Sequence, residues 1–568
     1  MNSFFDQWAE TSPSGGMTRQ AWVALALIAF LALFPGLSSV PAMDRDESRY
    51  AQASRQMMET GDFLNIKFQE YDRHKQPAGS YWLQSLFAQP FGGADAPIGA
   101  HRLPGFVFAL LAVGLTAWLG GRIFSPPVGL AAGIVLATTL VLSVEAKTAK
   151  TDAILLGLGM IAQTALMILM VEIKQKRPQF WGWPALLWGA LGASLLVKGP
   201  IFLMVTALTL IAFVAWKREP GLLLKVRPLP GVALALAIFV PWFVAINLAT
   251  DWAFAAEAIG HSMLGKVDEA QENHSGPLGY HIVATAITFW PGFALLGLGI
   301  LAAWHNRTSD SVKFLIAWII PTYVVFEIVA TKLAHYTLPS FPAIAILVGL
   351  GLSQLSELLR SWTGKMAHWA TAIVAMLVAS ALGFAPILAN RELGHELDFA
   401  SYGAVGFGFL AALVIGYLAL KPSLVRLAVS GLAAAGLYAC VFALAMPSMD
   451  KLWTSERLAR IVDQFEGCET FDVTVGGYRE PSVAFNLGTN TWLAYDGADT
   501  ARYLLENRAC GIAIVDALWQ ADFDAAIAQS GMSVRELAQF EGYNSVGADP
   551  LSLTIVTLST SSVRAPTP

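Results

Sequence analysis

Two acidic residues stand side by side in a polar stretch near the amino end of the chain. Asp46 and Glu47 lie at the start of a helix-like segment that runs from Glu47 to Glu59. Carboxylates at the lip of a cavity can act as a general base or hold a cation. The alternative is a solvated loop whose charges serve no reaction. Asp46 and Glu47 are therefore candidate catalytic residues, and metal binding is the second interpretation.

A basic and aromatic cluster follows in the same stretch. His74 and Lys75 lie between Tyr71 and the pair Tyr81-Trp82. A lysine beside aromatic rings at a membrane interface can meet a lipid phosphate as a point charge. An interfacial anchor belt has the same composition, because Trp and Tyr favour that depth for insertion alone. Both interpretations stay open on composition.

A lysine interrupts two apolar runs farther along the chain. Lys198 directly precedes Gly199-Pro200. An ionisable group at membrane depth is a functional candidate, whereas a side chain that snorkels to the interface is the structural alternative.

Histidines supply two more candidate positions. The run 331–339 places Lys332, His335 and Tyr336 at the end of an apolar stretch. His261 lies in a segment, 251–281, that mixes histidines with carboxylates. Such a mixture could bind a divalent metal, but its spacing matches no compact metal motif.

Membrane-spanning helices must position these residues. The 568 residues are 55% hydrophobic and 14% charged, whereas soluble domains carry about 25% charged residues. The net charge of -5 gives no reason to expect a nucleic-acid partner. Apolar runs long enough to span predict about thirteen transmembrane helices, near 21–40, 101–121, 126–144, 152–173, 182–197, 200–216, 229–249, 281–303, 314–330, 338–356, 369–389, 402–420 and 427–446.

Lys and Arg in the short loops predict the orientation. With thirteen spans, all of the short basic loops fall on one face of the membrane. The positive-inside rule makes that face cytoplasmic. The basic residues of these loops are Lys174, Lys176 and Arg177, Lys217 to Arg227, Arg307 and Lys313, Arg360 and Lys365, and Lys421 and Arg426. The amino end is then cytoplasmic, and residues 447–568 lie outside. All of the candidate residues above converge on the outer face, which favours a site for an anionic substrate.

The chain therefore divides into two predicted domains. Residues 1–446 form the membrane domain, with amphipathic helices in an outer loop at 41–100. Residues 447–568 form a small soluble α/β domain, because β-like runs at 471–478, 511–515 and 551–558 accompany a helical pattern at 521–529. Cys468 and Cys510 lie in this tail, and we expect them to pair if it faces an oxidising compartment.

The motifs resemble those of a known family. Asp46-Glu47-Ser48-Arg49-Tyr50-Ala51, Pro77 to Gln84, Lys198-Gly199-Pro200 and Lys332 to Pro339 are similar to the hallmarks of bacterial GT-C glycosyltransferases. The nearest likeness is to the aminoarabinose lipid A transferase group, within the protein O-mannosyltransferase superfamily. The resemblance covers nearly the whole chain and implies about thirteen helices followed by a periplasmic α/β domain.

The resemblance implies a function and a set of site residues. It implies transfer of a sugar from a polyprenyl-phosphate carrier to lipid A or another envelope glycolipid, on the periplasmic face of the inner membrane and with inversion at the sugar. The implied roles are Asp46 as the key carboxylate with Glu47 beside it, Asp152 as a second acid, Arg49, Lys75, Lys198, Tyr336 and Lys332 on the donor phosphate, His261 on a metal, and His335 and Glu480 near the cavity.

The first outer loop departs from the family pattern. The family has an acidic residue followed by Lys-Pro, whereas this chain reads His74-Lys75-Gln76-Pro77. Either Lys75 is the family lysine beside an insertion, or Gln76 has replaced it. The acidic metal ligand is absent from this run in both alignments, and His74 is its only candidate substitute there. A divalent metal is therefore an open expectation, and no nucleotide cofactor is expected.

A transporter or flippase for a lipid-linked sugar is the alternative function. A charged outer cavity would serve as its substrate path. Transporters of this kind are commonly built from two matching halves with broken helices, and the sequence shows no such repeat. The long outer loop and soluble tail fit a transferase better.

Overall fold

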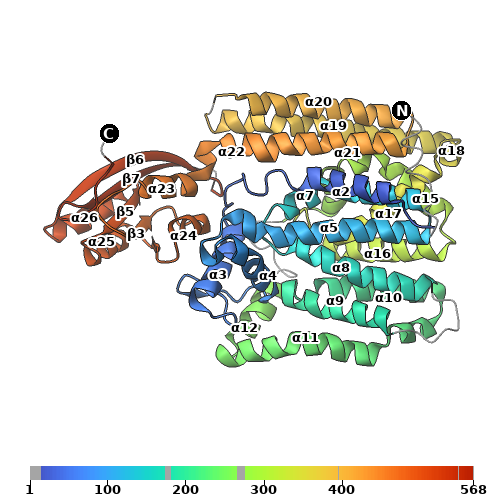
Figure 1. Ribbon diagram of the computed structural model, residues 1–568, viewed down its shortest axis with the longest axis horizontal. Coiled ribbons are helices and arrows are strands. Elements are labelled where there is room, and N and C mark those ends of the chain that lie inside the picture. Colours follow the sequence, from blue (N-terminus) through green and yellow to red (C-terminus); the bar gives the residue numbers. More distant parts are fainter. Residues whose placement is uncertain (1–14, 173–180, 265–274, 395, 548, 567–568) are drawn as a thin grey trace.

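The computed structural model describes residues 15–172, 181–264, 275–394, 396–547 and 549–566. Lys174, Lys176 and Arg177 lie outside these ranges. Apolar helices run side by side through most of the molecule, and a small sheet domain is attached at one end (Figure 1). The main helices are α2 (Arg19–Leu33), α5 (Ile98–Ile123), α6 (Pro126–Ala137), α7 (Leu140–Ala146), α8 (Asp152–Met167), α9 (Gly182–Lys198), α10 (Ile201–Lys217), α11 (Pro228–Ala249), α14 (Tyr280–Thr288), α15 (Leu296–His305), α16 (Asp310–Ile328), α17 (Phe341–Ser353), α19 (Trp362–Glu392), α20 (Phe399–Leu420) and α21 (Leu424–Tyr438).

The length and apolar character of these helices identify a multi-pass membrane protein. Within the described ranges, seven helices are long and apolar enough to span, and there are nine spans if two bent pairs each count as one. The pairs are α6 with α7, bent by 62°, and α14 with the segment Gly292–His305, bent by 110°. Helices satisfy their own backbone polar groups, which lipid cannot do. Each of the thirteen predicted ranges coincides with a helix or a bent pair, although the count of thirteen spans remains a prediction.

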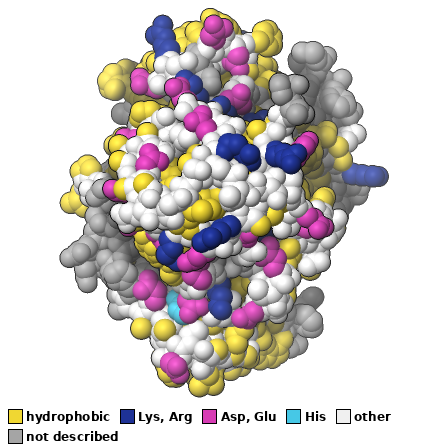
Figure 2. Space-filling model, turned by 90° about the vertical axis from the view of Figure 1, so that its left-hand side faces the viewer, with side chains coloured by type: hydrophobic (Ala, Val, Ile, Leu, Met, Phe, Trp, Pro, Cys, Tyr) yellow, Lys and Arg dark blue, Asp and Glu magenta, His cyan; other side chains and the backbone are white. Residues whose placement is uncertain are grey.

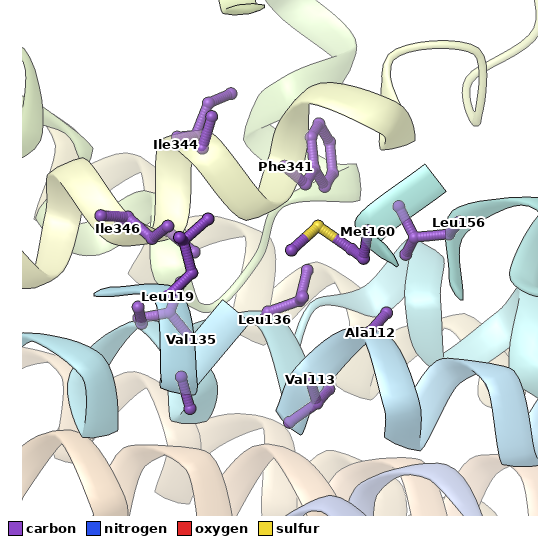
Figure 3. Close-up of a cluster of buried hydrophobic side chains, with 14 of the residues drawn as sticks. Ala112, Val113, Leu119, Val135, Leu136, Leu156, Met160, Phe341, Ile344 and Ile346 are labelled. Atoms are coloured by element: carbon purple, nitrogen blue, oxygen red, sulfur yellow. The ribbon is translucent and has the colours of Figure 1, made fainter. Parts of the chain in front are cut away.

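The centre of the bundle is a dry apolar core. Helix α8 and its continuation, Asp152–Val171, form the most enclosed of the long spans, with 89% of its apolar window buried. Side chains from α5, α6, α8 and α17 meet there (Figure 3), among them Val113, Leu136, Met160 and Phe341. This core fixes the helix ends that carry the polar residues.

Short elements cover the end of the bundle nearest the sheet domain (Figure 1). The first outer loop folds there into two helices, as expected, and a two-stranded antiparallel sheet that the sequence did not indicate. These elements are α3 (Asp46–Thr60), β1 (Lys67–Phe68), β2 (Tyr71–Asp72) and α4 (Gly79–Ala88), with α12 (Ala253–Ala255) beside them.

The tail is a five-stranded mixed sheet with helices, in the order β4-β3-β5-β7-β6. Strand β3 runs parallel to β4 and β5, and β7 runs antiparallel to β5 and β6. The three predicted strands and the predicted helix are present, and Cys468 and Cys510 form the expected disulfide. The elements are α23 (Thr454–Val462), β3 (Asp472–Gly476), α24 (Pro481–Leu487), β4 (Trp492–Ala494), α25 (Gly497–Glu506), β5 (Gly511–Asp516), α26 (Gln520–Gln529), β6 (Val534–Asn544) and β7 (Asp549–Leu558).

The basic loops gather at the end of the bundle away from the tail. Lys217 Nζ lies 2.9 Å from an Asp310 carboxylate oxygen, which joins the loops after α10 and before α16. Asn306 donates to Gln354 at 2.8 Å beside α18 (Leu355–Leu358), and α18 lies at the end opposite the sheet (Figure 1). The structure thus separates the basic loops from the first outer loop and the tail.

Candidate functional site

Helix α3 places the two candidate acids on different sides. The Asp46 side chain is 66% exposed and lies 4.0 Å from Arg49. Glu47, one residue later, is 2% exposed, because successive helical residues point about 100° apart. The preceding residue, Arg45, has a φ of 62°, a region that side chains other than glycine rarely adopt. The chain therefore turns sharply just before α3, and Asp46 is the first residue of that helix, with its side chain exposed.

Glu47 is an internal anchor. One carboxylate oxygen accepts from Arg102 Nε at 2.8 Å and from the Ala149 amide at 2.7 Å. The other accepts from Arg102 Nη2 at 2.8 Å and from the Met43 amide at 3.0 Å. These four bonds tie the first loop to α5 and to the turn before α8. The geometry therefore points to a positioning role for Glu47, in place of the predicted catalytic one.

A cavity of about 590 Å³ opens beside α3. Two of the predicted phosphate-binding residues, Arg49 and Lys75, line it together with His74 and Arg73. Asp72 and Glu257 also line it, so the wall carries both signs of charge. Three Lys or Arg side chains and a histidine around one hollow suit a phosphate-bearing ligand.

Arg73 is a site residue that the sequence analysis did not select. Its side chain is buried, Nε donates to Tyr81 Oη at 3.1 Å, and the guanidinium lies 5.2 Å from the centre of the Tyr50 ring. Tyr50 and Tyr81 stack with their centres 5.0 Å apart. An arginine held by aromatic rings keeps its orientation for charge-assisted hydrogen bonds. The signal available in the sequence was an arginine within the basic cluster.

A second group of charges is buried at the start of α8. Asp152 accepts from Lys198 Nζ at 2.7 and 2.8 Å. Lys150 lies 3.2 Å from Glu145, and the His335 ring lies between the two acids, at 3.7 Å from Glu145 and 3.8 Å from Asp152. The structure thus brings together three predicted residues, Asp152, Lys198 and His335. Lys198 is engaged by Asp152 instead of facing an open cavity.

The buried charges and the cavity adjoin each other. Asp46 lies within electrostatic reach of both Lys150 and Arg73. Burial lowers the pKa of His335, although Asp152 and Glu145 act in the opposite direction. The carboxylates of Asp152 and Glu145 are each paired with a lysine. With a neutral His335 imidazole between them, the net charge of this buried group is close to zero.

Tyr336 and Lys332 lie on a separate loop that packs against α14 and α16. Lys332 Nζ donates to the carbonyl oxygens of Glu327 at 2.7 Å and Val329 at 3.2 Å. The Lys332 ammonium therefore holds the loop by hydrogen bonds to its backbone. This points to a positioning role for Lys332 in place of the predicted phosphate contact. Tyr336 stacks on His281 with ring centres 6.4 Å apart, and its ring lies 5.3 Å from that of His335.

The tail reaches the first loop close to Asp46. Asp44 accepts hydrogen bonds from Ser482, from Ser545 at 3.0 Å and from Tyr478 at 3.4 Å. Burial raises the pKa of Asp44 above its usual range, and these hydroxyls oppose the rise. Burial also raises the pKa of Glu480, and the Asp44 charge adds to the rise. Glu480 therefore lies near Asp44 of the first loop, and its place at the cavity stays a prediction.

The structure describes the side chain of one of the two predicted metal ligands, His74. His74 lies 4.0 Å from Asp72 and 3.3 Å from the Asn65 amide oxygen. Burial lowers the pKa of His74, which favours the neutral form that binds metals. The His261 side chain lies outside the described part of the chain. Among the side chains that are described, no three His, Cys, Asp or Glu residues converge on a point.

The end of the molecule that carries the site is polar. Figure 2 shows Lys, Arg, Asp and Glu side chains interspersed across this face. Hydrophobic side chains gather toward its edges. This distribution fits a surface in water above the lipid-facing sides of the bundle.

Comparison with known proteins gives a consistent result. Residues 75–244 match the family described as dolichyl-phosphate-mannose-protein mannosyltransferase. Two relatives carry the name undecaprenyl phosphate-alpha-4-amino-4-deoxy-L-arabinose arabinosyl transferase. The protein from Aeromonas salmonicida is 25% identical over 70% of this chain and 72% of its own length. The protein from Pseudomonas aeruginosa strain LESB58 is 27% identical over 70% of both chains.

Solved structures show the same fold. The crystal structure of ArnT from Cupriavidus metallidurans bound to undecaprenyl phosphate has a TM-score of 0.73 and 18% identity, over 95% of this chain and 98% of that one. Its apo state has a TM-score of 0.70. The likeness extends through the bundle and the tail. The chain therefore has the fold of ArnT from Cupriavidus metallidurans and is similar in sequence to proteins named as arabinosyl transferases.

Proposed function

We propose that the protein transfers a sugar from a polyprenyl-phosphate carrier, such as undecaprenyl phosphate, to lipid A or another envelope glycolipid. The observation that carries this proposal is the cavity beside α3, where Arg49, Arg73 and Lys75 surround one hollow next to Asp46. Support comes from a shared fold with a structure that holds undecaprenyl phosphate.

The cationic wall suits the chemistry of the donor. A lipid phosphate is already a leaving group, and charge grows on its oxygens as the bond to the sugar breaks. Arg49, Arg73 and Lys75 would offset that charge in the transition state, which is the usual source of the largest rate gain. Lys198 acts on the same site through Asp152, whose carboxylate it holds at 2.7 Å.

Asp46 is the proposed catalytic carboxylate. If the acceptor is a sugar hydroxyl, Asp46 takes its proton as the hydroxyl attacks. If the acceptor is a phosphate, the attacking oxygen is already ionised, and Asp46 instead stabilises the positive charge that develops on the sugar ring. Attack from the face opposite the leaving phosphate inverts the anomeric centre in either case.

The proposed protein crosses the bacterial inner membrane with thirteen helices. The basic loops share the end of the bundle away from the tail, and the positive-inside rule makes that end cytoplasmic. The amino end is then cytoplasmic and the tail periplasmic. The disulfide between Cys468 and Cys510 supports this orientation, because such bonds persist in the oxidising periplasm.

Mass spectrometry of envelope lipids from strains with and without the gene tests the function. We expect one sugar to disappear from lipid A or another glycolipid in the deletion strain, while the carrier-linked sugar accumulates on the outer face. Accumulation on the inner face would instead indicate a transporter. Purified protein in nanodiscs with an undecaprenyl-phosphate-linked sugar and lipid A should reproduce the transfer.

A further inference from the structure

Phe485 is a tail residue that is buried in the membrane domain. It lies near the end of α24 and is 8% exposed. It packs in one apolar cluster with Ala42, Ala51, Ile98 and Ala149, all of them outside the tail. A large aromatic side chain among four small or branched ones acts as a wedge between the segments that carry them.

Two of those segments carry the site. Ala51 lies two residues beyond Arg49 on α3, and Ala149 directly precedes Lys150 in the turn that leads to Asp152. The Ala149 amide also donates to Glu47 at 2.7 Å. Phe485 therefore belongs to one apolar cluster with the helix of the exposed acid and with the turn that leads to the buried acid.

Polar and aromatic contacts fix the orientation of the ring. Arg55 Nη1 donates to the Phe485 carbonyl oxygen at 2.7 Å, and its guanidinium lies 5.8 Å from the ring centre. The His101 ring meets the Phe485 ring edge to face at 5.8 Å. Arg55 belongs to α3 and His101 to α5, so the wedge is held from both sides.

We propose that the tail domain is a positioning element of the active site, and that it acts through Phe485 by setting the distance between α3 and the turn that carries Lys150 and Asp152. The tail is thus part of the catalytic framework, even though Phe485 does not touch the reacting atoms. Loss of the wedge lets the Ala149 backbone move relative to Glu47. The distance from Asp46 to the buried charges then changes.

Two measurements test this proposal. The first, enzyme activity, rests on the proposed transferase function, and the second, hydrogen exchange, does not. We would compare the Phe485→Leu and Phe485→Ala variants of the full chain in nanodiscs, using an undecaprenyl-phosphate-linked sugar and lipid A. We expect kcat of Phe485→Ala to fall about 10- to 100-fold, because small misplacements of reacting groups have effects of this size. The donor KM should stay nearly constant, and Phe485→Leu should recover most of kcat.

Hydrogen exchange of the peptide 145–152 is the arm that needs no substrate. Phe485→Ala should accelerate exchange of the Ala149 amide, whose bond to Glu47 the wedge protects. Thr489→Ala is the matched control, since Thr489 also joins the tail to α3, through Gln52 and Glu59 at 2.7 Å each. This control should leave both kcat and Ala149 exchange unchanged.

The outcomes separate the two proposals. Wild-type kcat and unchanged exchange in Phe485→Ala would overturn the positioning role. If Phe485→Ala does not fold, Phe485→Val decides, because a lower kcat at constant KM supports the role and an unchanged kcat overturns it. A wild-type protein inactive with the polyprenyl donor would contradict the transferase proposal, and Ala149 exchange would still decide the role of Phe485.

Discussion

The Arg102 guanidinium and the Glu47 carboxylate meet through two hydrogen bonds of 2.8 Å in the interior of the protein. Neither side chain is more than 1% exposed. Arg102 also donates to the carbonyl oxygens of Leu37, Val40 and Pro41 at 2.6 to 2.9 Å. The pair thus closes the end of α2 onto the first outer loop.

Removing one partner of this pair should destabilise the protein. Glu47→Gln leaves the Arg102 charge buried without its counterion, and such losses amount to about 3–5 kcal/mol. We expect a lower midpoint of thermal unfolding in detergent and reduced expression, together with lost activity. A Glu47→Gln protein of normal stability that is inactive would instead return Glu47 to a catalytic role.

Asp46→Asn should abolish transfer and leave folding intact. The side chain is 66% exposed, so its charge contributes little to stability. Loss of a general base lowers rates about 10²- to 10⁴-fold. Transfer assays on membranes, with Asp62→Asn in the exposed part of the same loop as the control, would measure this. Normal transfer by Asp46→Asn would remove Asp46 from its proposed role.

Arg73→Gln should weaken donor binding. A hydrogen bond to a charged group contributes about 1.5–3 kcal/mol, so the donor KM should rise about 10- to 100-fold. Tyr81→Phe should have a smaller effect of the same kind, because it removes only the 3.1 Å bond that orients Arg73. Lys67→Ala, on an exposed strand residue, is the control. A KM unchanged by Arg73→Gln would place the phosphate elsewhere.

Asp152 and Lys198 should behave as a coupled pair. Each single replacement, Asp152→Asn or Lys198→Met, leaves one largely buried charge without its partner. The double variant removes both charges, and we expect it to be more stable than the sum of the single effects by about 0.5–3 kcal/mol. A double-mutant cycle on thermal unfolding measures this coupling. Additive effects would show that the two side chains act separately.

Docking of the tail should depend on pH. The pKa values of Asp44 and Glu480 are raised above their ordinary values of 3.8 and 4.5, so the docked tail favours the protonated forms. The stability from this source is fully present below those ordinary values, and it is lost as pH rises through the raised ones. The protection factor of the α24 amides, which is the measured exchange rate compared with the intrinsic rate at the same pH, should therefore be larger at about pH 5 than at about pH 8.

Matched variants assign that pH dependence. Asp44→Asn with Glu480→Gln should make the protection factors of α24 nearly independent of pH over the same range. Arg45 and Arg49 are the basic residues that act on Glu480. An unchanged pH profile in the double variant would assign the dependence to other groups.

The large elements were predictable because hydropathy alone determines them. Every apolar run became a helix or a bent pair, and the most hydrophobic tail runs became strands. The strand β4 was missed because it has only three residues, and β6 was missed because exposed polar residues interrupt its apolar pattern. The pairing of Arg564 with Glu466 in an isolated β-bridge has no signal in the polar composition of the last residues.

The candidate site was predictable in residue type more than in role. The sequence identified the acidic pair, but separating Asp46 from Glu47 requires the position of Arg102, which lies 55 residues away from Glu47. Lys332 and Lys198 were expected at a phosphate because the family resemblance implied that role. Their actual partners, carbonyl oxygens and Asp152, come from packing between distant segments.

The unusual backbone of Arg45 sets a limit on engineering this protein for stability. A residue held at a φ of 62° costs about 1–3 kcal/mol, and Arg45→Gly would relieve most of that strain. The same change would loosen the turn that presents Asp46 and remove a charge that faces Glu480. A search for heat-resistant variants would therefore tend to select against catalytic competence at this position.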